Sequence, residues 1–343
     1  MYGLARSLLF TLEPELAHDL SLRALATAHA AGAVRAATPR LPDDPVQVIG
    51  IGFPNPVGLA AGLDKNGEFV DCLAALGFGF IEVGTVTPRP QPGNARPRLF
   101  RLPQAQALIN RLGFNNDGVE ALVARVRANA ARPAALLGIN LGKNADTPIE
   151  RSGDDYAQGL AAVYPYARYV TINISSPNTR DLRTLQREEQ LDSLLARLAG
   201  ERSRLADRTG RRVPIAVKIA PDLGDDDLKR IADALVGHGL DAVIATNTTV
   251  QREQVTGLPD AQQAGGLSGQ PLFARSTQVV RTLSAHLRGA LPIIGVGGIL
   301  SGADAVEKLR AGASLVQMYT GLVYRGPCLV AECRRAIAQW RSG

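Results

Sequence analysis

The stretch Tyr169-Val-Thr-Ile-Asn-Ile-Ser-Ser-Pro-Asn178 is a β-branched, apolar run that ends in amides and hydroxyls. Residues 169–174 predict a buried strand, because β-branched side chains pack well on a pleated sheet and Pro177 cannot continue the hydrogen-bond ladder. A strand end that is dense in polar side chains is typical of a ligand site. A capped turn before a helix is the alternative, since serine and asparagine also favour turns.

Similar apolar runs alternate with helical patterns from about residue 56 onward. The runs are apolar throughout, which indicates strands buried on both faces, as in a parallel sheet. We predict strands at residues 57–61, 80–86, 135–141, 169–174, 215–219, 242–246, 293–296 and 315–319, and helices after each, for example at 69–76, 191–205, 226–236 and 303–309. Eight such units predict an α/β fold of the (β/α)8 TIM barrel class, with a doubly wound open sheet as the alternative.

Polar groups follow nearly every predicted strand, and their distribution favours the barrel. Barrel enzymes build their sites at the C-terminal strand ends, whereas an open sheet would concentrate these groups at one switch point. The strand-end groups are Asp64 and Lys65, Thr85, Asn140, Asn173 with Ser175 and Ser176, Lys218, Thr246 to Thr248, Gly297 and Gly298, and Tyr319 and Thr320.

Two of these ends carry lysines, Lys65 and Lys218. A buried ammonium without an anionic partner is costly, so both lysines indicate negative charge in the ligand. One suits a reduced ring and the other a carboxylate, with a structural salt bridge as the alternative for either. The glycine-rich segments 295–298 and 318–321 end the last two strands, where barrels often bind phosphate; a tight turn is the alternative there.

Amides are frequent in the same places, at Asn110, Asn140, Asn173, Asn178 and Asn247. Converging amides suit the alternating N–H and C=O edge of an imide or pyrimidine ring, because each offers a donor and an acceptor. None of the four histidines falls at a predicted strand end, which leaves Ser176 or a lysine as the acid–base group.

Composition narrows the function classes. The chain is 45% hydrophobic and 20% charged, which is typical of a soluble globular protein. A net charge of +6 suits an anionic ligand or lipid surface, and without a basic stripe interleaved with aromatics we expect no nucleic-acid partner. Cys72, Cys328 and Cys333 form neither an even disulfide set nor a C-x-x-C motif, so we expect a reducing cytoplasm and no metal site. We expect neither a transmembrane helix nor a signal peptide.

Residues 1–40 stand outside the repeat. Leu4 with Leu8, and Leu16 with Leu20, share helix faces, and Pro14 suits the first turn of a second helix. We therefore predict a small N-terminal helical hairpin at 1–40 and a catalytic barrel at 41–343. The hairpin is either a cap under the barrel or an amphipathic segment that touches membrane or an apolar substrate.

Taken together, the motifs resemble those of the class 2, quinone-dependent dihydroorotate dehydrogenases, in the same order and over essentially the full chain. They are Gly58-Leu-Ala-Ala-Gly-Leu-Asp-Lys-Asn66, Pro88-Arg-Pro-Gln-Pro-Gly-Asn94, Asn110-Arg-Leu-Gly-Phe-Asn-Asn116, Asn173-Ile-Ser-Ser-Pro-Asn-Thr179, Lys218-Ile-Ala-Pro-Asp222, Ala245-Thr-Asn-Thr-Thr249, Gly265-Gly-Leu-Ser-Gly269 and Gly295-Val-Gly-Gly-Ile299.

The resemblance implies oxidation of (S)-dihydroorotate to orotate in pyrimidine (UMP) biosynthesis, with hydride transfer to FMN and reoxidation by a membrane quinone. It implies that Ser176 is the base that takes the C5 proton; class 1 relatives carry cysteine there. The implied FMN contacts are Ala61, Gly62, Leu63, Asp64, Lys65, Thr85, Asn140, Asn173, Lys218 and Thr246, with the phosphate at Gly269, Gly298, Tyr319 and Thr320. The implied substrate contacts are Lys65, Asn110, Arg111, Leu112, Gly113, Phe114, Asn173, Asn178, Asn247 and Thr248.

The N-terminal segment also resembles the hairpin through which quinone reaches the flavin, with His18, Arg101 and Tyr319 near the route. The resemblance implies a monomer in peripheral contact with the cytoplasmic face of the cell membrane. Two other readings stay open. One is a barrel that binds a phosphate compound without redox chemistry, and the other is a flavoprotein with a soluble fumarate- or NAD-linked acceptor, against which the hairpin and Ser176 weigh.

Overall fold

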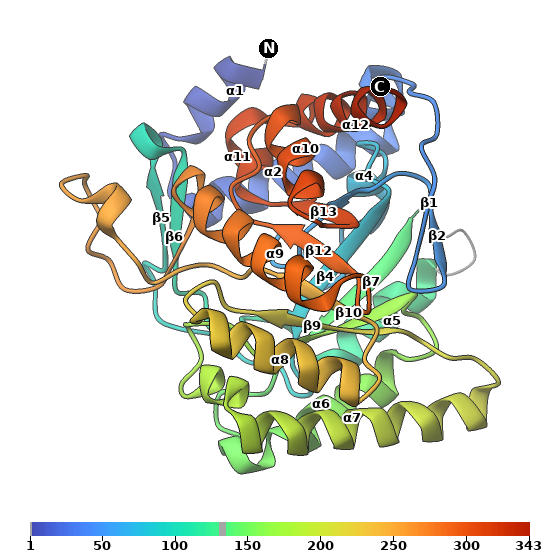
Figure 1. The fold of residues 1–343 in the computed structure, drawn as a ribbon. Coiled ribbons are helices and arrows are strands. Elements are labelled where there is room, and N and C mark those ends of the chain that lie inside the picture. The colour runs from blue at the N-terminus through green and yellow to red at the C-terminus, as the bar shows by residue number, and fades with distance from the viewer. Residues whose placement is uncertain (1, 130–134) are drawn as a thin grey trace.

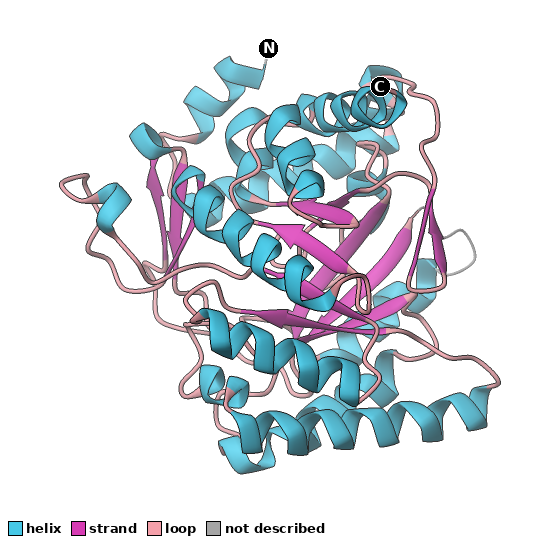
Figure 2. Ribbon diagram, in the orientation of Figure 1, coloured by secondary structure: helices cyan, strands magenta, loops and turns pink. Residues whose placement is uncertain are grey.

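Eight parallel strands close into a barrel in the computed structural model, which describes residues 2–129 and 135–343 (Figures 1 and 2). Met1 and residues 130–134 fall inside the two predicted segments and lie outside the described residues. The strand order around the barrel is β10-β12-β13-β3-β4-β7-β8-β9. Their bounds are β3 (Val57–Leu59), β4 (Phe80–Val86), β7 (Leu136–Leu141), β8 (Tyr169–Asn173), β9 (Ile215–Ile219), β10 (Ala242–Ala245), β12 (Ile293–Val296) and β13 (Leu315–Met318).

The predicted TIM barrel is thus confirmed, and the open-sheet alternative is wrong, because β13 pairs with β3 and closes the sheet at Val316 and Val57. Each predicted strand is present. Several end one or two residues earlier than predicted, where the chain leaves the sheet for the loops at the barrel mouth.

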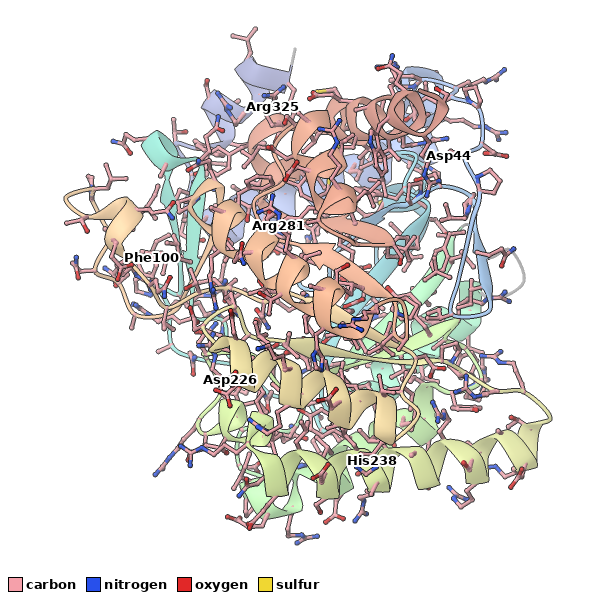
Figure 3. All side chains as sticks on the ribbon, in the orientation of Figure 1. Asp44, Phe100, Asp226, His238, Arg281 and Arg325 are labelled. Carbon is pink, nitrogen blue, oxygen red and sulfur yellow. The ribbon has the colours of Figure 1, made fainter. Side chains whose placement is uncertain are left out.

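Helices surround the barrel and bury one face each. In α8 (Asp225–Gly237), Leu228, Ile231, Ala232 and Leu235 are buried, the spacing of a single helix face. Charged side chains on the opposite faces are exposed, among them Asp226 of α8 and Arg281 of α9 (Phe273–Leu287), which Figure 3 labels. The other helices are α4 (Val70–Ala74), α5 (Val119–Asn129), α6 (Ser152–Val163), α7 (Glu188–Thr209), α9 (Phe273–Leu287), α10 (Gly302–Arg310), α11 (Thr320–Arg325) and α12 (Cys328–Ser342), with short 3-10 helices at Pro103–Ala105, Ile149–Arg151, Leu182–Gln186 (η3), Glu253–Val255 and Gln270–Leu272.

Two small antiparallel sheets lie outside the closed barrel. The hairpin of β1 (Val46–Val48) and β2 (Ile51–Phe53) places the Phe53 ring edge-on to Phe80 in the barrel interior, with ring centroids 5.1 Å apart. A three-stranded sheet of β5 (Leu99–Leu102), β6 (Ala107–Asn110) and β11 (Gly266–Gly269) stands beside the barrel in Figure 1. Its pairing brings Asn110 opposite Gly266, and so places two of the predicted site segments together.

The N-terminal segment forms α1 (Tyr2–Leu9), α2 (Pro14–Ala30) and the short α3 (Ala33–Ala37). Pro14 opens α2, as predicted, and the Glu13 side chain caps it by accepting the Leu16 N–H at 2.8 Å. Helix α2 lies beside the barrel mouth, because His18 shares a cavity with Lys65. The first turns of α2 therefore lie at the mouth rather than under the barrel. Within residues 2–129 and 135–343, no helix combines the length and apolar character that crossing a bilayer requires.

Candidate active site

The barrel mouth opens into a cavity of about 1060 Å³, a volume that includes the space at its entrance. The carboxyl ends of the parallel strands and the β5-β6-β11 sheet line it. It brings together most of the predicted site residues: Ala61, Gly62, Lys65, Thr85, Asn110, Leu112, Gly113, Phe114, Asn173, Ser176, Asn178, Lys218, Thr246, Asn247, Thr248, Gly269, Gly298, Tyr319 and Thr320.

Four predicted residues do not line this cavity. Leu63 and Asp64 line a neighbouring one, and the buried Asp64 carboxylate accepts the backbone N–H groups of Glu68 and Phe69 at 3.0 and 2.8 Å. Asp64 therefore holds the turn that carries Lys65, rather than facing the main cavity.

Arg111 points away from the cavity. Its guanidinium donates to the Gln263 Oε1 atom at 2.9 Å and lies 4.6 Å from the centre of the Phe100 ring, which Figure 3 labels. The residues on either side of it in sequence, Asn110 and Leu112, line the cavity, but Arg111 does not. Its side chain instead links the β5-β6 sheet to the loop at residues 263–264.

Asn140 lies beneath the cavity in a buried network around Glu82, a residue that the sequence analysis missed. The Glu82 carboxylate accepts hydrogen bonds from Asn140, Tyr169, Thr171 and Gln317 at 2.8–3.1 Å. An acidic residue in the middle of an apolar strand was the available signal, since a buried carboxylate needs such partners.

The network continues upward into the cavity. Thr85 donates its hydroxyl to Asn140 Oδ1 at 2.6 Å and accepts from Asn173 Nδ2 at 3.0 Å. Because the Glu82 carboxylate can only accept, it orients the Asn140 amide and, through Thr85, the Asn173 amide. This orientation fixes which donors and acceptors the cavity floor presents to a ligand.

The two strand-end lysines are both buried. Burial lowers the pKa of Lys65 to about 8, and the nearby Glu15 carboxylate opposes that shift. Burial also lowers the pKa of Lys218, against the opposing carboxylate of Glu82. An anion in the cavity would stabilise the charged form of each lysine, which is the electrostatic complement of a negatively charged ligand.

Ser176 is buried, and amides from several strand ends surround it. Its Oγ atom accepts the Asn178 backbone N–H at 3.2 Å, and the Asn178 side chain donates to Asn110 Oδ1 at 3.1 Å. Asn247 donates to the neighbouring Ser175 hydroxyl at 3.0 Å. The serine therefore lies in a polar pocket with donors and acceptors in fixed positions.

The cavity wall near strands β11 and β12 contains glycines at which a side chain would be strained and would collide with neighbouring atoms. Gly298 has φ +76°, and a Cβ there would lie 2.5 Å from Phe273 Cα; a Cβ on Gly269, at φ +97°, would lie 2.2 Å from Gln106 O. The Thr320 hydroxyl donates to Ser268 Oγ at 2.8 Å beside them. Bare backbone with hydroxyl groups nearby is the chemistry of a phosphate cradle.

A second cavity lies between α2 and the barrel mouth and shares Lys65 and Tyr319 with the first. His18 lines it, and burial together with the Lys65 charge lowers the His18 pKa to about 4, so this imidazole is neutral at neutral pH. Arg101 lies elsewhere: it donates to Leu12 O at 2.8 Å and stacks over the Phe10 ring. Of the three predicted tunnel residues, His18 and Tyr319 line this cavity, whereas Arg101 ties the hairpin to β5.

Comparison with known proteins agrees with this geometry. The family model for dihydroorotate dehydrogenase matches residues 45–340. Proteins named dihydroorotate dehydrogenase (quinone) from Ralstonia nicotianae and Burkholderia multivorans are each 62% identical, over 340 and 342 residues, covering 99% and 100% of this chain and 99% of each relative. The crystal structure of DHODH from Eimeria tenella in complex with ferulenol has a TM-score of 0.88 at 38% identity and covers 98% of this chain and 95% of that chain. The chain therefore belongs to the dihydroorotate dehydrogenase family, in the class whose curated members are named dihydroorotate dehydrogenase (quinone).

Proposed function

We propose that this protein oxidises (S)-dihydroorotate to orotate in pyrimidine biosynthesis, with FMN as its bound cofactor and a membrane quinone as the final acceptor. The observation that carries the proposal is the single cavity in which a buried Ser176, the lysines Lys65 and Lys218 and a set of ordered amides meet a glycine-lined wall. Such a cavity combines a base, positive charge, amides that can bind the N–H and C=O edge of an imide ring, and backbone N–H groups that can bind a phosphate.

The substrate roles follow from the polar groups around Ser176. Lys65 pairs with the substrate carboxylate, and Asn110, Asn178 and Asn247 hold the ring through its alternating N–H and C=O groups. Ser176 takes the proton from C5 as its own hydroxyl proton passes to solvent, and the electron pair of the C5–H bond forms the C5=C6 bond. The C6 hydrogen leaves as hydride, so that both electrons of the C6–H bond pass to the acceptor.

The remaining residues of the cavity are suited to binding the cofactor. The family is flavin-dependent, and bound FMN supplies the hydride acceptor. Gly269, Gly298 and Thr320 form the phosphate cradle, and Lys218 supplies positive charge beside the ring. The group fits the residues present: the Gln317 Oε1 atom is buried at the cavity wall and has no partner among the described residues, so it offers an acceptor to an N–H of a ligand.

The acceptor side rests on the N-terminal segment. Leu4, Leu8, Leu16 and Leu20 are 45–82% exposed, an apolar surface suited to the membrane interface, and the cavity behind α2 leads toward Lys65 and Tyr319. We propose that quinone enters here, that the protein is a monomer, and that it associates peripherally with the cytoplasmic face of the cell membrane.

Anaerobic single-turnover spectroscopy tests the proposal. Purified protein should be yellow, lose its flavin absorbance when dihydroorotate is added, and regain it with quinone faster than with fumarate or NAD. A colourless protein that FMN does not reconstitute would leave only a non-redox phosphate-binding barrel. A flavin that dihydroorotate does not bleach would reject the proposed substrate.

A further inference from the structure

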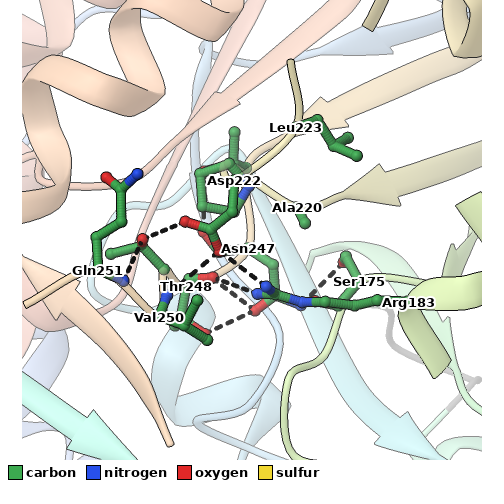
Figure 4. A network of polar contacts seen from close by, with 12 residues as sticks. Ser175, Arg183, Ala220, Asp222, Leu223, Asn247, Thr248, Val250 and Gln251 are labelled. Carbon is green, nitrogen blue, oxygen red and sulfur yellow. Dashed lines mark hydrogen bonds and ion pairs between the residues drawn. The ribbon is translucent and has the colours of Figure 1, made fainter. Parts of the chain in front are cut away.

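Three loops at the barrel mouth meet on one guanidinium outside the cavity (Figure 4). Arg183, in the 3-10 helix η3, donates from Nε to Ser175 O at 3.1 Å and from Nη2 to Thr248 O at 3.0 Å. Its Nη1 atom donates to Asp222 Oδ2 at 2.8 Å. These partners lie in the loops after β8, β9 and β10, so one side chain joins three consecutive strand ends.

Asp222 extends the connection along the third loop. Its carboxylate accepts the Thr249 hydroxyl and, at 3.2 Å, the Val250 backbone N–H, while Thr249 Oγ1 accepts the Gln251 N–H at 3.0 Å. The Arg183 and Asp222 side chains are only 25% and 15% exposed, which keeps the pair largely out of solvent and strengthens it relative to a surface ion pair.

The contacts are made next to the reacting groups. Ser175 precedes the proposed base Ser176, and Thr248 follows Asn247, which itself donates to the Ser175 hydroxyl at 3.0 Å. Neither Arg183 nor Asp222 lines the cavity, so either can influence the chemistry only through the loops that it holds. Arginine suits this place because its planar fork reaches three acceptors in different directions, which a lysine ammonium on a flexible stem does not reproduce.

We propose that Arg183, fixed by Asp222, is a positioning residue that holds the Ser176 loop in register with the substrate-binding Asn247–Thr248 loop. The proposal rests on the proposed function, because it assumes that Ser176 is the base. A displacement of about 1 Å between a base and its substrate costs roughly a hundredfold in rate, so the loss of this register should slow proton removal without emptying the flavin site.

The test separates the two half-reactions in flavin-loaded full-length protein. In Arg183→Ala, stopped-flow reduction by saturating dihydroorotate should slow by roughly a hundredfold, while reoxidation of dithionite-reduced protein by quinone stays at the wild-type rate. Arg183→Lys should be slowed as well, since it reaches fewer of the acceptors. The matched control is Arg180→Ala, from the same loop, whose side chain is 93% exposed and whose only ion pair is with the exposed Asp181 among the described residues.

Asp222→Asn tests the same contact with an isosteric change, and so keeps the test valid where Arg183→Ala fails to fold. It should slow reduction by a smaller factor, and the double variant should lose less than the product of the two single effects, because both act through one contact.

Reduction of Arg183→Ala and Asp222→Asn at the wild-type rate would overturn the positioning role alone. So would an equal slowing of both half-reactions, which would indicate general structural support. Failure of dihydroorotate to bleach wild-type protein and Arg180→Ala would instead reject the proposed function, and with it the assignment of Ser176 on which the positioning role depends.

Discussion

At the scale of single residues, Ser176 has a hydroxyl that is free to act on a ligand. The only hydrogen bond that its Oγ atom makes within the described chain is the one it accepts from the Asn178 N–H. Ser176→Ala should therefore slow flavin reduction by dihydroorotate about a hundred- to ten-thousandfold, the usual contribution of positioned proton transfer, and leave flavin bound. Anaerobic stopped-flow absorbance measures this. Wild-type reduction kinetics in the variant would exclude Ser176 as the base.

The charge of Lys65 should make the affinity for orotate depend on pH. With a pKa of about 8 in the free protein, Lys65 is cationic below pH 8 and increasingly neutral above it. The affinity for orotate, an anion, should therefore fall by about tenfold for each pH unit above the pKa, and stay level below it. Titration of the flavin spectrum with orotate measures the dissociation constant. Lys65→Met should bind orotate weakly at every pH; a variant that keeps the wild-type profile would exclude the lysine from this role.

At the scale of elements, the two N-terminal helices are attached to the barrel in different ways. Helix α1 buries no residue and is held through Tyr2 and Arg6, which donate to Val323 O and Tyr324 O at 2.6 and 2.8 Å. Helix α2 buries Glu15, whose carboxylate accepts two hydrogen bonds from the buried Arg98 at 2.8 and 3.0 Å. Burial raises the Glu15 pKa, but the Arg98 guanidinium outweighs this and holds it below its usual value, and removal of α2 would take away the carboxylate partner of Arg98.

The exposed leucines of α1 can therefore be tested without disturbing the barrel. In the double variant Leu4→Ser and Leu8→Ser, binding to anionic lipid vesicles should fall by at least about tenfold, because each leucine that enters an apolar phase contributes on the order of 1.5–3 kcal/mol. Flavin reduction by dihydroorotate should be unchanged, and reoxidation by a long-tailed quinone on vesicles should slow. Val236→Ser on α8, an exposed valine far along the chain, is the matched control. Unchanged vesicle binding in the double variant would exclude α1 as the membrane contact.

At the scale of the whole molecule, one buried lysine should couple stability to pH. Lys308 of α10 is fully buried and donates to Thr277 Oγ1 at 2.8 Å, to Ser276 Oγ and to Phe273 O. Burial lowers its pKa to about 7, with smaller effects from Asp304, Arg281 and Glu307. Ser276 also donates to Gly297 O, so this cluster lies directly behind the glycine-lined wall of the cavity.

The direction in which stability changes with pH follows from the number of protons that the folded and unfolded states bind. Between the folded pKa of about 7 and the ordinary lysine value of about 10.4, the unfolded chain binds more protons, so this group makes the protein more stable as pH rises. The unfolding free energy of wild type, relative to Lys308→Met, should rise by up to about 1.4 kcal/mol per pH unit in that window. Urea unfolding of both proteins at several pH values measures the difference. A difference that does not change with pH would mean that Lys308 stays protonated in the fold.

The eight strands, their burial in a parallel sheet and the location of the site at the barrel mouth could be predicted from the sequence, because each depends on a local pattern. A β-branched run predicts a strand wherever it lies, and a polar residue at its carboxyl end lies at the mouth once the strands are parallel. Pro14 at the start of α2 and the exposed leucines of the hairpin could be predicted for the same reason.

The directions of particular side chains, and the groups that they contact, could not be predicted in this way, because they depend on the folded chain. Glu82 became the centre of the cavity floor through Gln317, which lies 235 residues away in the chain, and Arg183 became a junction through Thr248, 65 residues away. The sequence predicts that Asn140 and Arg111 line the cavity. Asn140 instead lies below it, bound to Glu82, and Arg111 faces outward, bound to Gln263. Side-chain direction depends on strand register and on neighbours that long-range pairing brings together, and neither of these is encoded within a short stretch of sequence.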